Sequence, residues 1–484
     1  MHKTFIASRL VAATVAALTS LLASAQALSV VPVGMMDSAP PAVWRATSRL
    51  GYAPTPDQTA ALTPRAWALN QIDLAYAASQ QAPAIPPELA RINAPLGDIA
   101  RDFQAEREAR KILRTQAVPD ASGKLPLSPP AAGVPAFSRE MAQSAAAWRV
   151  MACSDPALEN PLLARMTEFW FNHLNVFVGK GNVRPFVGHY AVNVIRAHAL
   201  GRFEDLLLAS ARHPAMLYYL DQAQSSNRGL NENYARELME LHTLGVGGGY
   251  TQNDVHELAR ILTGWTVNLR DGEGFRFAER LHDKGSKTFL GRSYTSEGMQ
   301  EGEDAIRFLA RQPATAHRVS ERLATFFVAD RPPPALVERL SQTFLASQGD
   351  IRAVMRTLVA SPEFWAADNL LFKTPLDFAC SALTAAGGVK DRRDMVQALG
   401  FLAQAGQPMH GWQTPDGYKT DAATWLAPEA LTRRADFAMG LAQRIPEPLY
   451  LNAFFSLATQ QRIAREPEKM RTGLMLASPD FMRK

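Results

Sequence analysis

The sequence predicts an all-α, mostly helical fold, and three observations support that prediction. Apolar residues recur with helical spacing in nearly every long segment, strict apolar–polar alternation is scarce, and Asn-Gly or Asp-Gly hairpin signals are few. The 484 residues include only 30 Gly, 32 Pro and 2 Cys, which excludes collagen-like, low-complexity and disulfide-scaffold classes. We therefore expect one large multi-helix body with long irregular loops.

Residues 1–27 have the features of a secretory signal peptide. Lys3 and Arg9 form a basic start, an apolar run covers residues 10–22, and an Ala-Gln-Ala sequence ending at residue 27 suits cleavage. The apolar run is short for a membrane span of about 20 residues, and an uncleaved anchor is the alternative interpretation. We expect a periplasmic or secreted protein with no stable membrane span after cleavage.

The charge of the chain is nearly balanced. It has 51 basic and 46 acidic residues, and removal of Lys3 and Arg9 with the signal peptide leaves 49 basic residues and a net charge of +3. No basic stripe runs along the sequence. Nucleic acid is therefore not an expected partner.

A Pro-, Ala- and Gly-rich stretch, residues 115–137, predicts a linker or a long surface loop. It separates an N-terminal helical part, residues 28–114, from a main helical body, residues 138–484. Two further irregular regions, residues 268–296 and 406–424, are places to look for function, because loops on a rigid scaffold often carry sites.

The helix predicted to begin at Pro161 carries the first candidate residue. Asn160 suits the N-cap and Pro161 the first helical position. The helix is apolar around almost its whole circumference, so we expect it to be central and His173 to be buried. His173 is then either a core histidine held by one hydrogen bond or a metal ligand or acid–base group.

A second helix is predicted over residues 231–242. On a regular helix Glu237 and Glu240 share a face with Arg236, whereas His242 points well away from both carboxylates. The spacing of Arg236 and Glu240 fits an ordinary exposed ion pair. The same dense polar group would indicate a site if it were buried.

A third helix is predicted from a capping-box-like start at Thr251 to Gly264, and it precedes a weaker signal. Glu279 and His282 have ExxH spacing, and Asp283 follows directly. A carboxylate-bridged di-metal site needs two such motifs and two more acids, so one ExxH is weak support for a metal.

The loop over residues 406–418 combines a Pro-Asp-Gly turn with Trp412 and Tyr418. The two aromatic rings form either a carbohydrate or peptide platform or a plug that packs the loop onto the body. The two cysteines, Cys153 and Cys380, lie outside CxxC and CxxCH motifs. Export makes a disulfide between them feasible, and the sequence leaves their pairing open.

Several motifs in order resemble the bacterial family catalogued as domain of unknown function 1800. The run over residues 231–246, with residues 249–252 and 262–265 after it, carries most of the resemblance, which extends from about Trp44 to Phe481. It implies an exported, largely helical protein, often encoded beside a second exported family that resembles sulfatases and phosphatases. The family has no established reaction.

One departure from the family pattern concerns the first helix. Family members often have Trp-His-Asn-His-Phe where this chain has Trp170-Phe171-Asn172-His173-Leu174. A site that needs two histidines at this position would be lost or altered here.

Two hypotheses of different class follow. The first is an exported metal-dependent enzyme, a hydrolase or oxidoreductase that acts on an envelope or extracellular polymer and uses Zn, Mn or Fe. Its site would gather the catalytic residues Glu237, Glu240 and His242 and the metal ligands His173, His282 and Asp283. The second is a non-catalytic exported binding or assembly partner, in which the same residues form a buried structural polar network. A co-exported sulfatase- or phosphatase-like protein is the expected partner.

Overall fold

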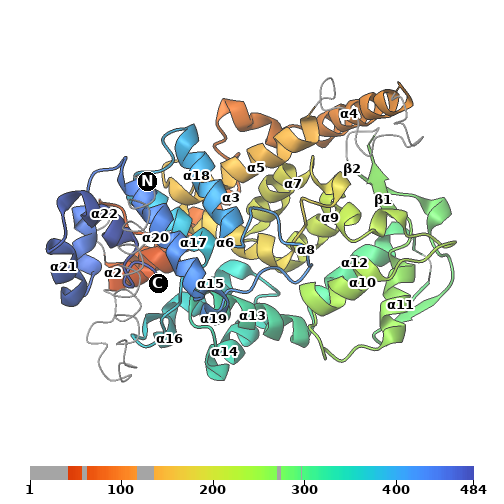
Figure 1. Ribbon diagram of the computed structural model, residues 1–484. Coiled ribbons are helices and arrows are strands. Elements are labelled where there is room, and N and C mark those ends of the chain that lie inside the picture. Colours follow the sequence, from red (N-terminus) through yellow and green to blue (C-terminus); the bar gives the residue numbers. More distant parts are fainter. Residues whose placement is uncertain (1–41, 57–62, 117–135, 270–273, 296) are drawn as a thin grey trace, which may run out of the picture. The chain divides into compact units, whose positions relative to one another are not determined.

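The computed structural model describes residues 42–56, 63–116, 136–269, 274–295 and 297–484, which are helical over most of their length (Figure 1). The strands in these ranges form two antiparallel two-stranded sheets. The prediction of a mostly helical fold is confirmed. The predicted signal peptide and residues 117–135 of the predicted linker lie outside the described residues.

The helices of the first half of the chain are mostly short, and the last of them is a π-helix. The α-helices are α2 (Ala42–Arg49), α3 (Pro64–Ser79), α4 (Leu96–Gln116), α5 (Phe137–Ser154), α6 (Pro161–His173), α7 (Val187–His189), α8 (Phe203–Arg212), α9 (Pro214–Tyr219) and α10 (Asn233–Glu237). The 3-10 helices are η2 (Pro87–Asn93), η3 (Gly181–Val183) and η5 (Gln222–Gln224), and the π-helices are η4 (Tyr190–Arg196) and η6 (Leu238–His242).

The second half carries the strands and then further helices. Its α-helices are α11 (Gln252–Ile261), α12 (Met299–Ala310), α13 (Pro313–Phe327), α14 (Pro334–Ala346), α15 (Ile351–Ala360), α16 (Pro362–Trp365), α17 (Pro375–Ala385), α18 (Arg392–Gln404), α19 (Ala422–Trp425), α20 (Pro428–Ala442), α21 (Leu457–Ala464) and α22 (Glu468–Leu476). The 3-10 helices are η7 (Glu279–Leu281) and η8 (Leu449–Phe454), and the strands are β1 (Trp265–Asn268), β2 (Gly274–Phe277), β3 (Lys287–Phe289) and β4 (Arg292–Tyr294).

The region predicted as irregular, residues 268–296, therefore contains most of the strand residues. Strand β3 pairs with β4 across a two-residue turn at Leu290 and Gly291, whose φ angles are 46° and 75°. Two consecutive positive φ angles match the twist of a hairpin, but Leu-Gly is not the usual sequence for such a turn. The hairpin consequently gave no clear signal in the sequence.

Two helix starts follow the predicted capping chemistry. The side chain of Asn160 accepts a hydrogen bond from the backbone N–H of Leu163 at 3.0 Å, and Pro161 opens α6. Thr251 and Asp254 form a reciprocal capping box at the start of α11. Each cap satisfies backbone N–H groups that have no partner inside the helix.

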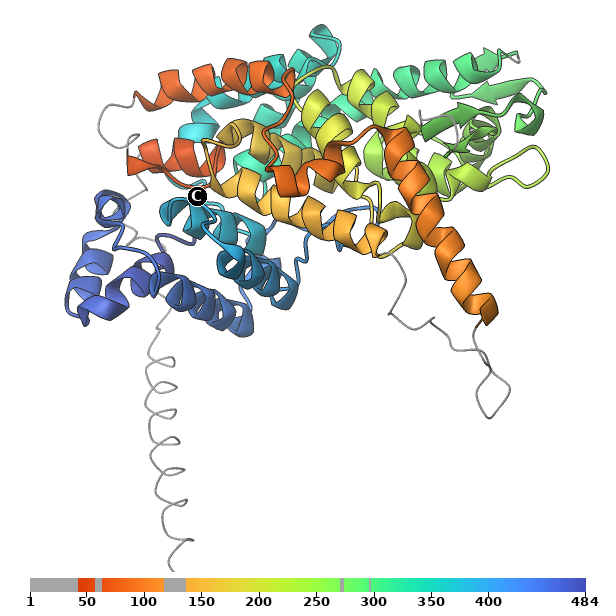
Figure 2. The same ribbon diagram turned by 90° about the horizontal axis from the view of Figure 1, so that it is seen from above.

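The core consists of two hydrophobic clusters. The first surrounds α6 and includes residues of η4, α8, α9 and α11 to α15, and Figure 1 shows α13, α14 and α15 packed in succession. The second surrounds α17, α18, α20 and α22. Helix α5 packs on α17 and α18, as Figure 2 shows, and contributes side chains to both clusters.

Helices on both sides of residues 117–135 belong to one compact unit, residues 40–484. Helix α3 packs on α6 and α15, and α4 packs on α5. None of the helices in the described ranges is long and apolar enough to cross a membrane.

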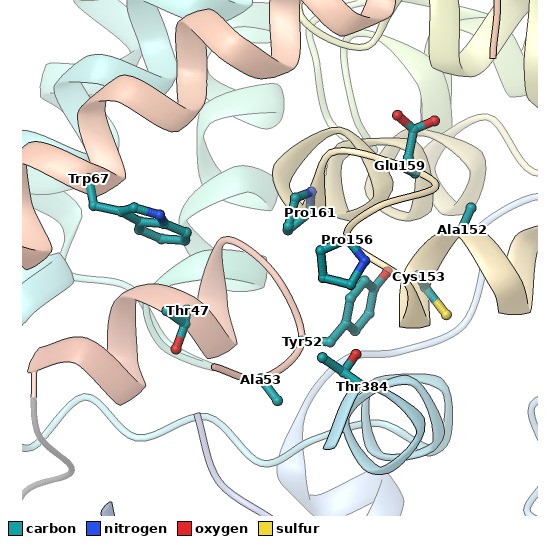
Figure 3. A pocket seen from close by; sticks show the side chains of 10 residues that line it. All are labelled: Thr47, Tyr52, Ala53, Trp67, Ala152, Cys153, Pro156, Glu159, Pro161 and Thr384. Atoms are coloured by element: carbon teal, nitrogen blue, oxygen red, sulfur yellow. The ribbon is translucent and has the colours of Figure 1, made fainter. Parts of the chain in front are cut away.

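A disulfide joins α5 to α17 within the second hydrophobic cluster. Cys153 on α5 and Cys380 on α17 are bonded, with their Cα atoms 5.6 Å apart and a sequence separation of 227. Figure 3 shows a cavity lined by Tyr52, Cys153 and Thr384 among other residues. Its volume of about 10 Å³ suits one water molecule and is too small for a substrate.

Candidate functional site

The second predicted helix changes its winding before it reaches His242. Regular α10 covers Asn233–Glu237, and Leu238–His242 form the π-helix η6. The prediction of one regular helix over residues 231–242 was wrong in its last turn. A π-segment has one extra residue per turn, which rotates His242 away from its expected direction, and such segments are frequent at functional sites.

His173 and His242 lie together in the core. The Nε2 atom of His173 is 3.0 Å from the carbonyl oxygen of His242, and the ring centroids are 6.4 Å apart. A carbonyl only accepts, so Nε2 of His173 carries the proton. Each residue is 1% exposed. Among the described residues, Nδ1 of His173 and Nε2 of His242 have no hydrogen-bond partner.

Both imidazoles are neutral at neutral pH. Burial, together with the positive charges of Arg318 and Arg322, lowers the pKa of His242 to about 3. Burial also holds the pKa of His173 well below its ordinary value, and the same two arginines add to the effect. The histidines are therefore hydrogen-bonding groups rather than cations.

Arg318 and Arg322 lie one turn apart on α13, next to this histidine pair. The Nε atom of Arg318 donates to the carbonyl oxygen of Leu241 in η6 at 3.0 Å, which ties α13 to the π-helix. Burial, together with the neighbouring charge of Arg318, lowers the pKa of Arg322 to about 10. Within the described ranges neither guanidinium is in an ion pair.

Three carboxylates interact with one another, and one of them, Asp416, also interacts with Arg322. Burial raises the pKa of half-buried Glu237, and the negative charge of Glu240 raises it further. Asp416, from the loop before α19, also raises the pKa of Glu237 and, by attraction, that of Arg322. We call these residues the polar cluster: Glu237, Glu240, Asp416, Arg318 and Arg322. The two arginines also act on His173 and His242.

The ion pair expected between Arg236 and Glu240 is loose. Nη1 of Arg236 lies 3.9 Å from Glu240, while Nη2 lies 3.2 Å from Glu232. All three side chains are about one third exposed, so these pairs contribute little, about 0.3–0.5 kcal/mol each. Glu240 remains available to other groups, and it also interacts with the hydroxyl of Tyr250.

The end of α6 fixes the loop that carries Asp416. The amide of Asn172 donates to the carbonyl oxygen of Tyr418 at 3.0 Å and accepts from its N–H at 2.8 Å. Asn175 donates to the carbonyl oxygens of Trp412 and Thr414 at 3.1 and 2.9 Å. These bonds, with the hydroxyl of Tyr418 on a core carboxylate, match the plug interpretation of the loop.

Gly417 allows this close approach. Its φ is 71°, and a Cβ atom built there would lie 2.2 Å from the carbonyl oxygen of Asn172. Only glycine avoids both the strained φ angle and the overlap. The sequence at this position therefore determines where the neighbouring Asp416 lies.

His282 and Asp283 have a different set of partners. Nδ1 of His282 lies 2.9 Å from the carbonyl oxygen of Thr263, and its Nε2 lies 3.4 Å from buried Glu301. Asp283 accepts two hydrogen bonds from Arg260, at 2.9 and 3.1 Å. None of these partners is shared with His173 or His242. His173 and His242 lie together, Glu237 interacts with Glu240, and His282 and Asp283 lie in another environment.

The donor groups do not fit a metal ion. Within the described residues no group of three or more His, Cys, Asp or Glu side chains is placed to hold one. Nε2 of His173 donates its proton to a carbonyl oxygen, and the carboxylate of Asp283 accepts a hydrogen bond from Arg260. The function proposed below includes no step through a metal.

A second charged group is fully buried, and we call it the ionic centre. Arg165 on α6 forms ion pairs with Glu168, at 3.1 Å, and with Asp377 on α17. Lys484 also pairs with Asp377. Tyr52 donates to Glu168 at 2.8 Å. All five residues are at most 4% exposed.

The ionic centre connects the two hydrophobic clusters. Arg165 belongs to the helix at the middle of the first cluster and Asp377 to the helix at the middle of the second. The N–H and C=O of Lys484 bond to the backbone of Leu371 at 2.9 and 3.0 Å, which positions its ammonium group beside Asp377. Burial alone would raise the pKa of Asp377, but the two cations hold it below its ordinary value.

Sequence reasoning missed both arginines of the polar cluster and most of the ionic centre. Arg318 and Arg322 lie on an amphipathic helix, where basic residues usually face water. Arg165 offered a signal, because a charged residue on an otherwise apolar helix needs a buried partner. That partner, Asp377, is 212 residues away and has no local mark in the sequence.

Comparison with known proteins gives a family and no relative of known function. A family model with the description "Protein of unknown function (DUF1800)" matches residues 45–483, nearly the whole chain. No curated protein matches the sequence. No solved structure matches it either.

Proposed function

The chain belongs to the DUF1800 family, and we propose that it is an exported enzyme that hydrolyses an envelope or extracellular polymer at the polar cluster. One observation carries this proposal. Glu237, a carboxyl group with a raised pKa, is influenced by Asp416, and Asp416 in turn attracts Arg322, which has no ion-pair partner in the described ranges. Enzymes that hydrolyse by acid–base catalysis commonly use carboxyl groups whose different environments give them different pKa values, with fixed positive charge beside them.

Each group has a role that fits its surroundings. Glu237 keeps its proton to a higher pH than an ordinary glutamate, which suits a general acid that protonates the leaving oxygen. Asp416 is exposed and suits the base that takes a proton from the attacking water. The positive charge of Arg322 attracts Asp416, which helps to hold that carboxylate in place.

Export is part of the proposal and has two supports. Residues 1–27 have the pattern of a signal peptide, although they lie outside the described residues. Disulfides form and persist in the periplasm and outside the cell, and this chain pairs its two cysteines. Fractionation of cells that express the tagged chain tests the location: a mature product in the cytoplasm would contradict it.

The catalytic role is tested by a matched pair of glutamine variants. Mature protein is incubated with acidic exopolysaccharide, peptidoglycan and neutral glucan, and new reducing ends are measured. We expect Glu237→Gln to lower the rate about 10²- to 10⁴-fold. Glu429→Gln, at an exposed position on α20, serves as the control and keeps the wild-type rate. Equal rates for Glu237→Gln and wild type would overturn the proposal.

A second candidate function is a non-catalytic binding or assembly partner of a co-exported sulfatase- or phosphatase-like protein. The ionic centre favours it, because that group uses buried charges to fix helix packing. Size-exclusion chromatography of the two exported proteins together tests it. A stable complex with Glu237→Gln, combined with no hydrolysis by wild type, would support this candidate over the enzyme.

A further inference from the structure

A small pocket lies between α5, α6 and the loop that carries Asp416. It is partly open to solvent and has a volume of about 30 Å³. That is about twice the space that one water molecule needs, so a small polar group fits. The residues that matter for its chemistry are Arg149, Asn172, Gln407, His410, Trp412 and Tyr418.

The acceptors that line this pocket are already in use. Oε1 of Glu168 accepts from Tyr418, and its Oε2 accepts from Tyr52 and Arg165. Oδ1 of Asn172 accepts from the N–H of Tyr418. A ligand therefore finds few free acceptors on these walls.

The donors, in contrast, are unused. Oε1 of Gln407 accepts from the N–H of Leu376 at 2.8 Å, which fixes the amide and leaves its Nε2 group without a partner. Nε1 of Trp412 and both ring nitrogens of His410, one of which carries the proton of the neutral ring, also lack partners among the described residues. Gln407 and His410 are 4% and 6% exposed, and unpaired polar groups at that depth are costly unless a ligand pairs with them.

The pocket also contains an unpaired positive charge. Arg149 is 6% exposed, and within the described ranges its guanidinium forms no ion pair and no hydrogen bond. Its charge acts on His410, whose imidazole burial already keeps neutral. His410 has a φ of 55°, which is strained for a residue other than glycine and is often found where a ligand binds.

We propose that this pocket binds a carboxylate group, held by the guanidinium of Arg149 and by the free N–H groups of Gln407 and Trp412. A carboxylate offers only acceptors and one negative charge, which complements the free donors and the unpaired charge of Arg149. The carboxylate of Glu168 on the same walls is already paired with Arg165. Its size fits the pocket, whereas a sugar ring does not. The site is separate from the polar cluster and does not depend on the proposed hydrolysis.

Thermal unfolding with added carboxylate tests the site. Sodium acetate probes a free small carboxylate and trigalacturonate a carboxylate on a sugar chain, each against sodium chloride at equal ionic strength. We expect at least one of them to raise the Tm of wild type in a saturable way. The ligand that gives the lower half-saturation concentration identifies the source of the carboxylate. An equal effect of chloride would overturn the proposal.

Three variants connect the effect to the pocket. Arg149→Gln is expected to raise the half-saturation concentration about tenfold or more. Arg462→Gln, at an exposed position on α21, is the control and behaves as wild type. Gln407→Glu supplies a carboxylate from the chain itself while its other oxygen still accepts from Leu376. Because it pairs with Arg149, it should match or exceed the wild-type Tm and lose the response to carboxylate.

If Arg149→Gln fails to fold, the Gln407→Glu variant still tests whether the pocket binds a carboxylate. A lowered Tm with a retained response to acetate or trigalacturonate would show that no carboxylate belongs in this pocket. Wild-type half-saturation in a folded Arg149→Gln protein would lead to the same conclusion.

Discussion

The ionic centre and the polar cluster contain similar side chains in opposite arrangements. In the ionic centre every charge contacts a partner of opposite sign: Asp377 lies between Arg165 and Lys484, and Glu168 accepts from Arg165 and Tyr52. In the polar cluster the charges influence one another without such contacts. Arg318 and Arg322 have no ion-pair partner in the described ranges, and the pKa of Glu237 is raised.

From this difference we infer that the ionic centre serves the stability of the fold and the polar cluster serves its chemistry. Buried charges that satisfy one another lose much stability when one member is removed, because the other is left unpaired. Charges that repel one another, as Glu237 and Glu240 do, gain nothing from folding and are retained for another reason. Four changes test this contrast.

Asp377→Asn should have the largest effect. It leaves Arg165 and Lys484 buried without their shared carboxylate, so we expect a loss of about 3–5 kcal/mol in the free energy of unfolding. Urea denaturation measures the loss. Asp436→Asn, at an exposed position on α20, is the control and should change stability by less than about 0.5 kcal/mol. Equal, small losses would show that the ionic centre does not stabilise the core.

Removal of the disulfide should come next. The double variant Cys153→Ala and Cys380→Ala removes the covalent link between α5 and α17, and a disulfide typically contributes about 2–4 kcal/mol. Urea denaturation of oxidised wild type and of the double variant gives the difference. An unchanged midpoint would mean that the ionic centre and the hydrophobic clusters alone hold these helices.

Acid should weaken the fold through the buried histidines. The pKa of His242 is about 3 in the folded protein, below the value of about 6.5 in the unfolded chain, so the unfolded state binds protons first. Stability is full above pH 6.5 and falls as the pH decreases, by about 2 kcal/mol at pH 5 for His242 alone. Denaturation of His242→Gln at pH 7.5 and pH 5 should show a smaller pH dependence; a slope identical to that of wild type would contradict the assignment.

Gly417→Ala should have the smallest of these effects on stability. The positive φ angle and the overlap with Asn172 cost about 1–2 kcal/mol and detach the loop at Tyr418. Limited proteolysis should then cut the loop faster than in wild type. Gly400→Ala, at a helical position with open space for a Cβ atom, is the control. Equal cleavage rates would show that Gly417 does not fix the loop.

The sequence predicted features that depend on neighbouring residues. Asn160 and Pro161 begin α6 and Thr251 begins α11, because capping uses groups three residues apart. The burial of His173 also followed from the composition of its own helix. These local signals are enough for a helical fold and for the position of one histidine.

Features that depend on residues far apart in the chain could not be predicted from the sequence. The change to π-helix before His242 places that ring beside His173, and nothing in residues 238–242 alone marks it. The approach of Asp416 to Glu237 joins segments 179 positions apart through a loop fixed by Asn172. The prediction that His282 and Asp283 share a site with His173 and His242 was likewise based on residue types and not on geometry.

The most direct test compares Glu168→Gln with Glu237→Gln in urea at several pH values. Glu168 accepts three hydrogen bonds in the ionic centre, so its loss should reduce the unfolding free energy by about 2–4 kcal/mol. The raised pKa of Glu237 means that folded protein loses stability as the pH rises above the ordinary glutamate range. Glu237→Gln should remove that loss and be as stable as wild type or more so at pH 7. Equal destabilisation by both variants would contradict the division between a stabilising ionic centre and a functional polar cluster.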